Sequence, residues 1–249
     1  MMIPFRKYYL LFFATILVLP LACKKENSCD CFKSTGDIIT ENRTPGLVNR
    51  IILDDNINLI LTSGNAVQLS VEAGENLLPL IKTEIAGNEI HIRNDNKCNW
   101  VRSYKYKPTV YLTVPMVDYI EYSGSGDITM TNTFYCDTIA VNSWDGSGTI
   151  NLNLNCNASH LNIHTGPADI NVTGNVGQSY IWYVGNGMIH AENFSSFYTY
   201  ITNKGTGNCY LNVTNELYAN ITWTGCIYYR GNPQIVVPNI SGKGTLIKE

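Results

Sequence analysis

The stretch Gly124-Ser-Gly126-Asp-Ile128 decides the fold of this chain, because its pattern returns about every twenty residues. The pattern is a small residue, any residue, a second small residue, any residue and then an apolar residue. A period near twenty is typical of stacked supersecondary units, none of which can bury its own apolar face alone. The further copies are Gly146-Ser-Gly148-Thr-Ile150, Gly166-Pro-Ala168-Asp-Ile170, Gly185-Asn-Gly187-Met-Ile189, Gly205-Thr-Gly207-Asn-Cys209, Trp223-Thr-Gly225-Cys-Ile227 and Gly242-Lys-Gly244-Thr-Leu246.

Apolar residues also recur two residues later in most copies, with a polar or aromatic residue between the two apolar positions. Successive side chains of a strand point to opposite faces, so the apolar columns predict the interior. Short strands and glycine corners in turns of this length predict an all-β fold, a single-stranded right-handed parallel β-helix (solenoid) with ~20-residue rungs. An antiparallel sandwich would need hairpin loops at shorter spacing. The first interior column contains Ile128, Ile150, Ile170, Ile189, Cys209, Ile227 and Leu246.

The first half of the chain carries alternating apolar residues that predict strands with one inward face. A short break in this alternation, at residues 75–81, predicts a single helical turn. The predicted strands are residues 57–61, 67–71, 89–93 and 109–114.

The N-terminus has the features of an export signal. Arg6 and Lys7 precede an apolar run, residues 8–19, that is short for a membrane span. The segment ending at Cys23 resembles the lipobox of bacterial lipoproteins, in which this cysteine is acylated and becomes the first mature residue. We therefore expect a lipoprotein signal peptide at 1–22, a tether at 23–45 and a β-helix domain at 46–249. A plain secretory signal and an uncleaved anchor are the alternatives.

The charge balance argues against nucleic acid as a partner. Loss of Arg6 and Lys7 with the signal lowers the 17 basic residues to 15 against 20 acids, a formal charge of −5. Such a chain lacks the basic surface that nucleic-acid binding needs. The membrane, through the N-terminal lipid, is the first expected partner.

The cysteines suggest two pairings in an exported protein. Cys136 and Cys156 each lie ten residues before a repeat glycine, so they should be neighbours on adjacent rungs. They predict either a disulfide or two stacked buried thiols. Cys98 is expected to pair with Cys29 or, as our first choice, with Cys31.

The order and spacing of several motifs resemble one known family. The family is described as putative auto-transporter adhesin, head GIN domain, and the resemblance covers roughly residues 46–249. It implies a right-handed β-helix in an envelope lipoprotein of Bacteroidetes, with no established enzymatic activity. The motifs are Glu75-Asn-Leu-Leu, Gly87-Asn-Glu-Ile-His-Ile, Tyr122-Ser-Gly-Ser-Gly-Asp-Ile and Tyr229-Arg-Gly-Asn-Pro233.

The repeats offer little for catalysis. Asp127 and Asp169 share a column two turns apart, roughly 10 Å, at or beyond the range of paired carboxylates in glycosidases. Both are expected to cap corner amides instead. His160 and His164 are not neighbours on a strand, and no cysteine pair has zinc spacing. No catalytic residue, metal site or cofactor is therefore expected.

The strongest candidate ligand site in the sequence is a basic, aromatic stretch between two predicted strands. Cationic groups beside aromatic faces suit a sugar that carries carboxylate or phosphate groups. A connecting loop with a solvated basic face is the explanation of this stretch that we favour over a ligand site. A second candidate is the outward aromatic set Trp182, Tyr210 and Tyr228. The residues of the first candidate site are Arg93, Lys97, Trp100, Arg102, Tyr104 and Lys105.

Together these observations predict a non-enzymatic, lipid-anchored envelope protein, an adhesin or binding module for a glycan or a partner protein. The expected location is the outer membrane, on its periplasmic or surface-exposed side. A structural or assembly module of the envelope is the alternative, and a polysaccharide-cleaving enzyme is a weaker one.

Overall fold

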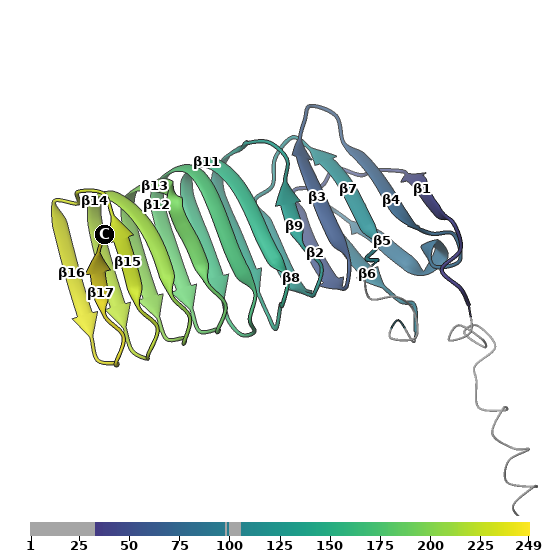
Figure 1. Ribbon diagram of the computed structural model, residues 1–249. Helices are drawn as coiled ribbons and strands as arrows, with labels where there is room; N and C mark the ends of the chain where they lie inside the picture. Colours follow the sequence, from purple (N-terminus) through teal and green to yellow (C-terminus); the bar gives the residue numbers. More distant parts are fainter. Residues whose placement is uncertain (1–32, 98, 100–105) are drawn as a thin grey trace, which may run out of the picture.

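The computed structural model describes residues 33–97, 99 and 106–249 (Figure 1). These residues form a nearly all-β structure, in which the sheet winds into a solenoid of about 6 turns with rungs of about 20 residues. Figure 1 shows the rungs standing side by side in one column, with the first seven strands at one end and β16 at the other. The predicted fold class, a parallel β-helix, is confirmed.

The solenoid is built from long strands that pair in parallel with the rung before and the rung after. Strand β12 (Asp169–Tyr183) pairs with β11 (Thr149–Ile163) on one side and β13 (Ile189–Asn203) on the other. The remaining rung strands are β8 (Tyr119–Gly124), β9 (Ile128–Met130), β10 (Phe134–Ser143), β14 (Cys209–Ile221), β15 (Ile227–Arg230), β16 (Ile235–Ile240) and β17 (Leu246–Lys248).

The interior column predicted from the repeat is present along the whole solenoid. Ile128 pairs with Ile150, Ile150 with Ile170, and the register continues through Ile189 to the last rung. Each of these isoleucines is fully buried, and Cys209 fills the same position as a small core residue. Burial of this continuous apolar column is the main source of stability that a rung alone could not supply.

The first strands form a less regular unit that continues into the solenoid. Strands β2 and β3 pair in parallel with solenoid strands β8 and β9, whereas β4 pairs with its neighbours in antiparallel fashion. The four predicted strands and the helical turn, here a 3-10 helix at Leu78–Leu80, are confirmed. The strands are β2 (Arg50–Asp55), β3 (Asn58–Ser63), β4 (Gln68–Gly74), β5 (Ile81–Ala86), β6 (Glu89–Asn94) and β7 (Thr109–Val114).

One further strand, β1 (Ile38–Arg43), lies inside the range expected to be a tether. It adds to the edge of β4 in antiparallel fashion, and five of its six residues are exposed. The side chain of Arg43 donates hydrogen bonds to the carbonyls of Ile81 and Leu78. The strand therefore depends on backbone pairing and one arginine, which leave no apolar pattern in the sequence.

The repeat glycines are needed chiefly for close packing of rungs rather than for left-handed backbone angles. Of the glycines in the repeat, only Gly166 has a positive φ, 90°. At Gly148 and Gly207 a Cβ would instead collide with the carbonyl oxygen of the preceding rung, at Gly126 and Gly187. Left-handed backbone angles, a common reason for glycine at a corner, do not explain most copies, because neighbouring backbones meet there with no room for a side chain.

Side chains at the corners tie each rung to the next. Asp127 accepts a hydrogen bond from the amide of Thr149 at 2.9 Å, and Asp169 accepts one from Met188 at 2.7 Å. These contacts confirm the predicted capping role of both carboxylates. The same hydrogen bonds engage the two carboxylates that a glycosidase-type mechanism would have required.

Candidate functional site

A row of four aromatic side chains crosses the outer face of the solenoid. His160, Tyr180, Tyr200 and Tyr218 occupy equivalent positions on β11, β12, β13 and β14. Consecutive rings are stacked nearly parallel, with centroids 4.9, 5.3 and 4.9 Å apart. This spacing follows from the separation of hydrogen-bonded strands, about 4.8 Å, so the ladder is a direct product of the rung register.

A second outer row lies two residues further along each strand. It is rich in amides and contains one large ring, Trp182, which is 39% exposed. The side chain of Asn239 donates a hydrogen bond to Asn220 at 3.3 Å, and Lys204 lies over the Trp182 ring, 4.3 Å from its centroid. The members of this row are Asn162, Trp182, Thr202, Asn220 and Asn239.

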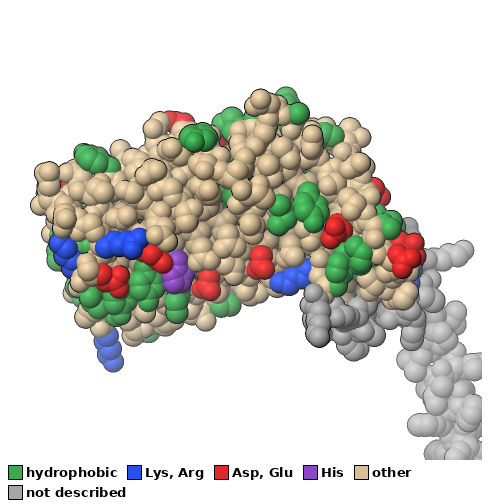
Figure 2. Space-filling view, turned by 45° about the horizontal axis from the view of Figure 1, so that its top comes forward, with side chains coloured by type: hydrophobic (Ala, Val, Ile, Leu, Met, Phe, Trp, Pro, Cys, Tyr) green, Lys and Arg blue, Asp and Glu red, His purple; other side chains and the backbone are tan. Residues whose placement is uncertain are grey.

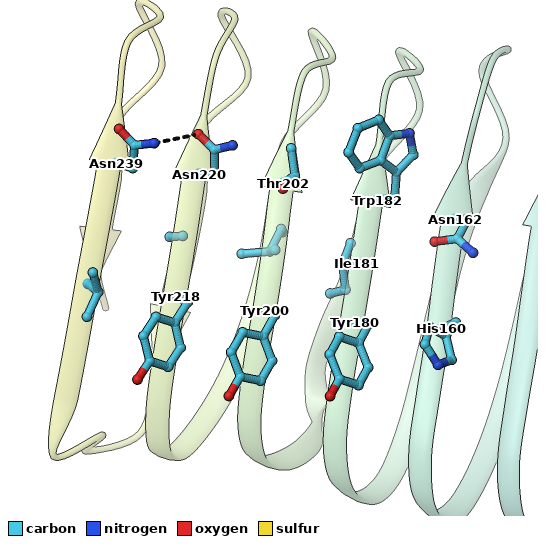
Figure 3. Close-up of a pocket in the computed structure, with 13 residues that line it drawn as sticks. His160, Asn162, Tyr180, Ile181, Trp182, Tyr200, Thr202, Tyr218, Asn220 and Asn239 are labelled. Carbon is cyan, nitrogen blue, oxygen red and sulfur yellow. Dashed lines mark hydrogen bonds between the residues drawn. The ribbon is translucent and has the colours of Figure 1, made fainter.

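The two rows border a shallow groove with a volume of about 470 Å³ (Figure 3). Figure 3 shows the three tyrosine rings in one row in front of the strands and the amide-rich row parallel to it. Among the described residues that line the groove there is no Asp, Glu, Lys or Arg. An uncharged groove with rings on one side and amides on the other can bind a ligand that has both apolar faces and hydroxyl groups.

Two of the three tyrosine hydroxyls in the row are held by side chains two residues earlier on the same strand. Tyr180 donates a hydrogen bond to Gln178 at 2.7 Å, and Tyr218 donates one to Glu216 at 3.0 Å. The hydrogen bond to Glu216 is the largest cause of the raised pKa of Tyr218. Two of the rings are therefore positioned before any ligand arrives.

This ladder was not part of the sequence prediction, although its signal is visible there. The four residues follow one another at steps of 20, 20 and 18 residues. They lie next to the inward apolar residues of the second half of each rung, such as Ile181 and Ile201, which are buried. Aligning the outer positions rung by rung, as was done for the interior, would have found them.

The predicted outward aromatic set is divided between two places. Trp182 lines the groove, whereas Tyr210 and Tyr228 continue a separate ladder that starts at His190. The centroids in that ladder are 5.2 and 5.0 Å apart. All three side chains do face outward, but Tyr210 and Tyr228 are not among the residues that line the groove.

The predicted basic loop lies mostly outside the described residues, which include neither Trp100, Arg102, Tyr104 nor Lys105. Arg93 is described, and its guanidinium makes a bidentate ion pair with Glu84, with both distances 2.7 Å. It also donates a hydrogen bond to Asp95 at 3.1 Å. These contacts raise the pKa of Arg93 and lower that of Glu84, chiefly through the hydrogen bonds between them.

Lys97 is also described, and its side chain is exposed. The structure thus shows Arg93 engaged by two carboxylates, and the binding role of the loop as a whole stays a prediction.

The cysteine register is confirmed, since Cys136 pairs with Cys156 on the adjacent rung. Neither cysteine forms a disulfide in the structure, where Cys156 is buried and Cys136 is half-buried. The hydrogen bond between them lowers the pKa of Cys136 and raises that of Cys156. The disulfide itself stays a prediction, and Cys23, Cys29, Cys31 and Cys98 lie outside the described residues.

Residues 33–97, 99 and 106–249 contain neither a candidate metal centre nor a helix that could span a membrane. No cluster of three or more His, Cys, Asp or Glu side chains could hold a metal ion there. In the same part of the chain no helix is long and apolar enough to cross a membrane.

Figure 2 shows one face of the molecule, on which most charged side chains lie in a single band and much of the remaining surface is polar and uncharged.

Comparison with known proteins identifies the family of the chain. The family model described as "Putative auto-transporter adhesin, head GIN domain" matches residues 49–233. The chain belongs to this family. The resemblance seen in the sequence is thereby confirmed, and a member of an adhesin-type family is expected at the cell surface or in the envelope.

Several solved structures have a similar fold. A protein of Bacteroides fragilis titled a putative adhesin aligns with a TM-score of 0.80 and 22% identity, over 86% of this chain and 97% of its own. A putative lipid binding protein of Parabacteroides distasonis aligns with a TM-score of 0.69 and 19% identity, over 87% and 98%. A putative adhesin of Parabacteroides merdae gives 0.64 and 20%, over 87% and 98%. At these identities the likeness shows the fold. No curated protein matches the chain.

Proposed function

We propose that this head GIN domain protein is an envelope-anchored, adhesin-type binding module and that its groove holds a glycan. The observation that carries the proposal is the pairing of an aromatic row with an amide-rich row along one groove. Sugar rings have apolar C–H faces that pack against aromatic rings and hydroxyl groups that bond to amides. The two rows offer both kinds of contact on opposite sides.

The uncharged lining supports recognition of sugar hydroxyls rather than of a strongly charged polymer. A polyanion would need clustered basic side chains, which the described groove residues do not provide. Cleavage of a glycosidic bond would need two carboxyl groups near the scissile bond. The groove lining provides none, which supports binding without catalysis.

The arrangement of the chain supports presentation of the groove away from a membrane. We propose that Cys23 is acylated and that the residues before β1 form a short tether to the lipid. The groove lies on β11 to β14 and β16, and it runs from the middle of the solenoid to the end away from β1 (Figure 1). A stack of about 6 turns at ~4.8 Å per rung would place the last rung of the groove, on β16, up to roughly 29 Å from the first turn.

The binding proposal is tested on a glycan array with the purified protein. The double variant Tyr180→Ala with Tyr200→Ala should lose tenfold or more in signal, since each ring contributes about 0.5–1.5 kcal/mol. The matched control is Tyr210→Ala with Tyr228→Ala, which removes two stacked rings that do not line the groove. Equal loss in both variants, or retention in both, would contradict the groove assignment.

Absence of glycan binding together with co-purifying envelope proteins would instead favour the assembly role. Release of shortened or unsaturated sugars from a bound polymer would establish an enzyme. Anchoring is tested separately by metabolic labelling with a fatty acid, which should be incorporated into the wild type and lost in Cys23→Ser.

A further inference from the structure

The groove repeats itself along the solenoid axis, which restricts the shape of its ligand. Each of β11, β12, β13 and β14 contributes one ring to the first row and one side chain to the second. The fifth rung continues both rows with Val237 and Asn239 on β16. Four steps of ~4.8 Å give the groove a length of about 19 Å, far longer than one sugar.

The contacts within each rung are alike, so a ligand that fills the groove needs a matching repeat. The stacked rings stand 4.9, 5.3 and 4.9 Å apart, and an extended chain of β1,4-linked pyranoses advances by nearly one such step per sugar. On four of the five rungs a sugar could therefore meet a ring on one side and an amide, hydroxyl or indole N–H on the other, and on the fifth rung Val237 takes the place of the ring. Trp182 and Thr202 fill the second row on the two central rungs.

An extended peptide fits this repeat poorly. A peptide strand along the axis rises about 3.3 Å per residue, so side chains on one face recur at ~6.6 Å and lose register within two rungs. A peptide lying across the rungs would need a free sheet edge. Within the groove β12, β13 and β14 are hydrogen-bonded to strands on both sides, so these strands offer no such edge.

We propose that the groove takes a linear β-linked polysaccharide lying parallel to the solenoid axis, with one sugar over each rung. This inference rests on the proposed glycan-binding function and adds the ligand's shape, direction and length. The site then binds internal segments of a polymer rather than its terminal sugar. Neighbouring subsites on one rigid scaffold add their contributions, so affinity depends on chain length.

The test is a length series measured by calorimetry on the wild-type protein. The probes are β1,4-linked oligomers of glucose, N-acetylglucosamine, mannose and xylose, each from a single sugar to an octamer. In at least one series affinity should rise roughly three- to tenfold per added sugar and level off near five sugars, the number of rungs in the groove. The α1,4-linked glucose series, whose chains coil, should show no such rise.

Each outcome has a distinct meaning. If the array is positive but a single sugar binds as tightly as a hexamer, the inference fails while glycan binding stands. The same holds if the array is positive and no β1,4-linked series binds. If no glycan binds at all, both fail, and capture of a peptide that Tyr200→Ala abolishes would replace them.

Variants on successive rungs provide a second readout. Tyr200→Ala removes the ring in the middle of the row, so affinity should stop rising with chain length at two or three sugars. Tyr218→Ala, nearer the end of the row, should lower by about one or two the number of sugars at which affinity levels off. The control Tyr210→Ala should leave the curve unchanged, and identical curves for all three variants would overturn the inference. Thermal unfolding of each variant confirms that the fold is intact.

Discussion

The backbone amide of Gly148 donates a hydrogen bond of 2.9 Å to the hydroxyl of Tyr122, a fully buried side chain of the preceding rung. The same hydroxyl donates to the carbonyl of Gly126 at 2.7 Å. Tyr183 repeats this arrangement with Gly187 and Gly207, at 2.7 and 3.1 Å. One tyrosine thus closes a corner of its own rung and fixes the position of the next.

Replacing the hydroxyl should therefore cost more than a surface change. Tyr183→Phe leaves the amide of Gly207 and the carbonyl of Gly187 without this partner in the interior, so we expect a loss of about 1–3 kcal/mol in the free energy of unfolding. Urea denaturation measures it. Tyr135→Phe, at a ring that is 68% exposed, should change stability by less than about 0.5 kcal/mol.

Tyr122 also predicts how stability responds to alkaline pH. Burial raises the pKa of Tyr122 to about 12, whereas a tyrosine in the unfolded chain ionises near pH 10. The folded state holds the proton more tightly, so this contribution is complete below about pH 10 and is lost as the pH rises towards 12. Unfolding free energies measured across this range should fall less steeply in Tyr122→Phe. An unchanged slope would show that the hydroxyl is ionised as easily in the folded protein.

Close contact between rungs predicts a strong effect of one methyl group at a corner. Gly207→Ala places a Cβ against the carbonyl oxygen of Gly187 and the hydroxyl of Tyr183, which should destabilise the protein by about 1–3 kcal/mol. Gly87 is a useful control, because its φ is 63° and a Cβ there would meet nothing within 4 Å. Gly87→Asn should be nearly neutral, since asparagine tolerates this conformation. Equal melting temperatures for both variants would refute the packing explanation.

The paired thiols predict an order of chemical reactivity. The hydrogen bond from Cys156 lowers the pKa of Cys136, which is half-buried, whereas burial raises the pKa of the enclosed Cys209. The thiolate is the reactive form, so iodoacetamide should modify Cys136 before Cys209. In Cys156→Ala the pH profile of Cys136 alkylation should move to higher pH. Mass spectrometry of the digest would also reveal a Cys136–Cys156 disulfide after oxidation.

The ion pairs of Arg93 separate the two candidate binding surfaces. Because Arg93 is held by Glu84 and Asp95, Arg93→Ala should leave binding on the glycan array unchanged, whereas Tyr200→Ala should weaken it at least threefold. A loss in Arg93→Ala with normal binding by Tyr200→Ala would return the site to the basic loop.

The interior could be predicted from the sequence because it depends on period alone. Ile128, Ile150 and Ile170 align once the repeat is counted, and the structure places them in one buried column. The capping roles of Asp127 and Asp169 followed from residue type and corner position. These features are local, repeated and insensitive to where the strands bend.

Other features depend on three-dimensional detail that the repeat does not contain. Trp182 and Tyr210 are both outward, yet which face of the solenoid each joins depends on where the strand turns its corner. Strand β1 is held by backbone hydrogen bonds to β4, which any side chains could make. The groove emerges only when outer positions of several rungs are compared, and the aromatic loop before β7 was the more conspicuous local pattern.

Each rung is in register only with the rungs next to it, and this has an evolutionary consequence. Among the described strands, β12 pairs only with β11 and β13, so excising the segment from Ile170 through Met188 would join Asp169 to Ile189 and recreate an intact corner. Excision would thus remove one rung, and duplication of the same segment would add one. Unequal recombination could thus change the length of the solenoid by whole rungs without any new kind of contact.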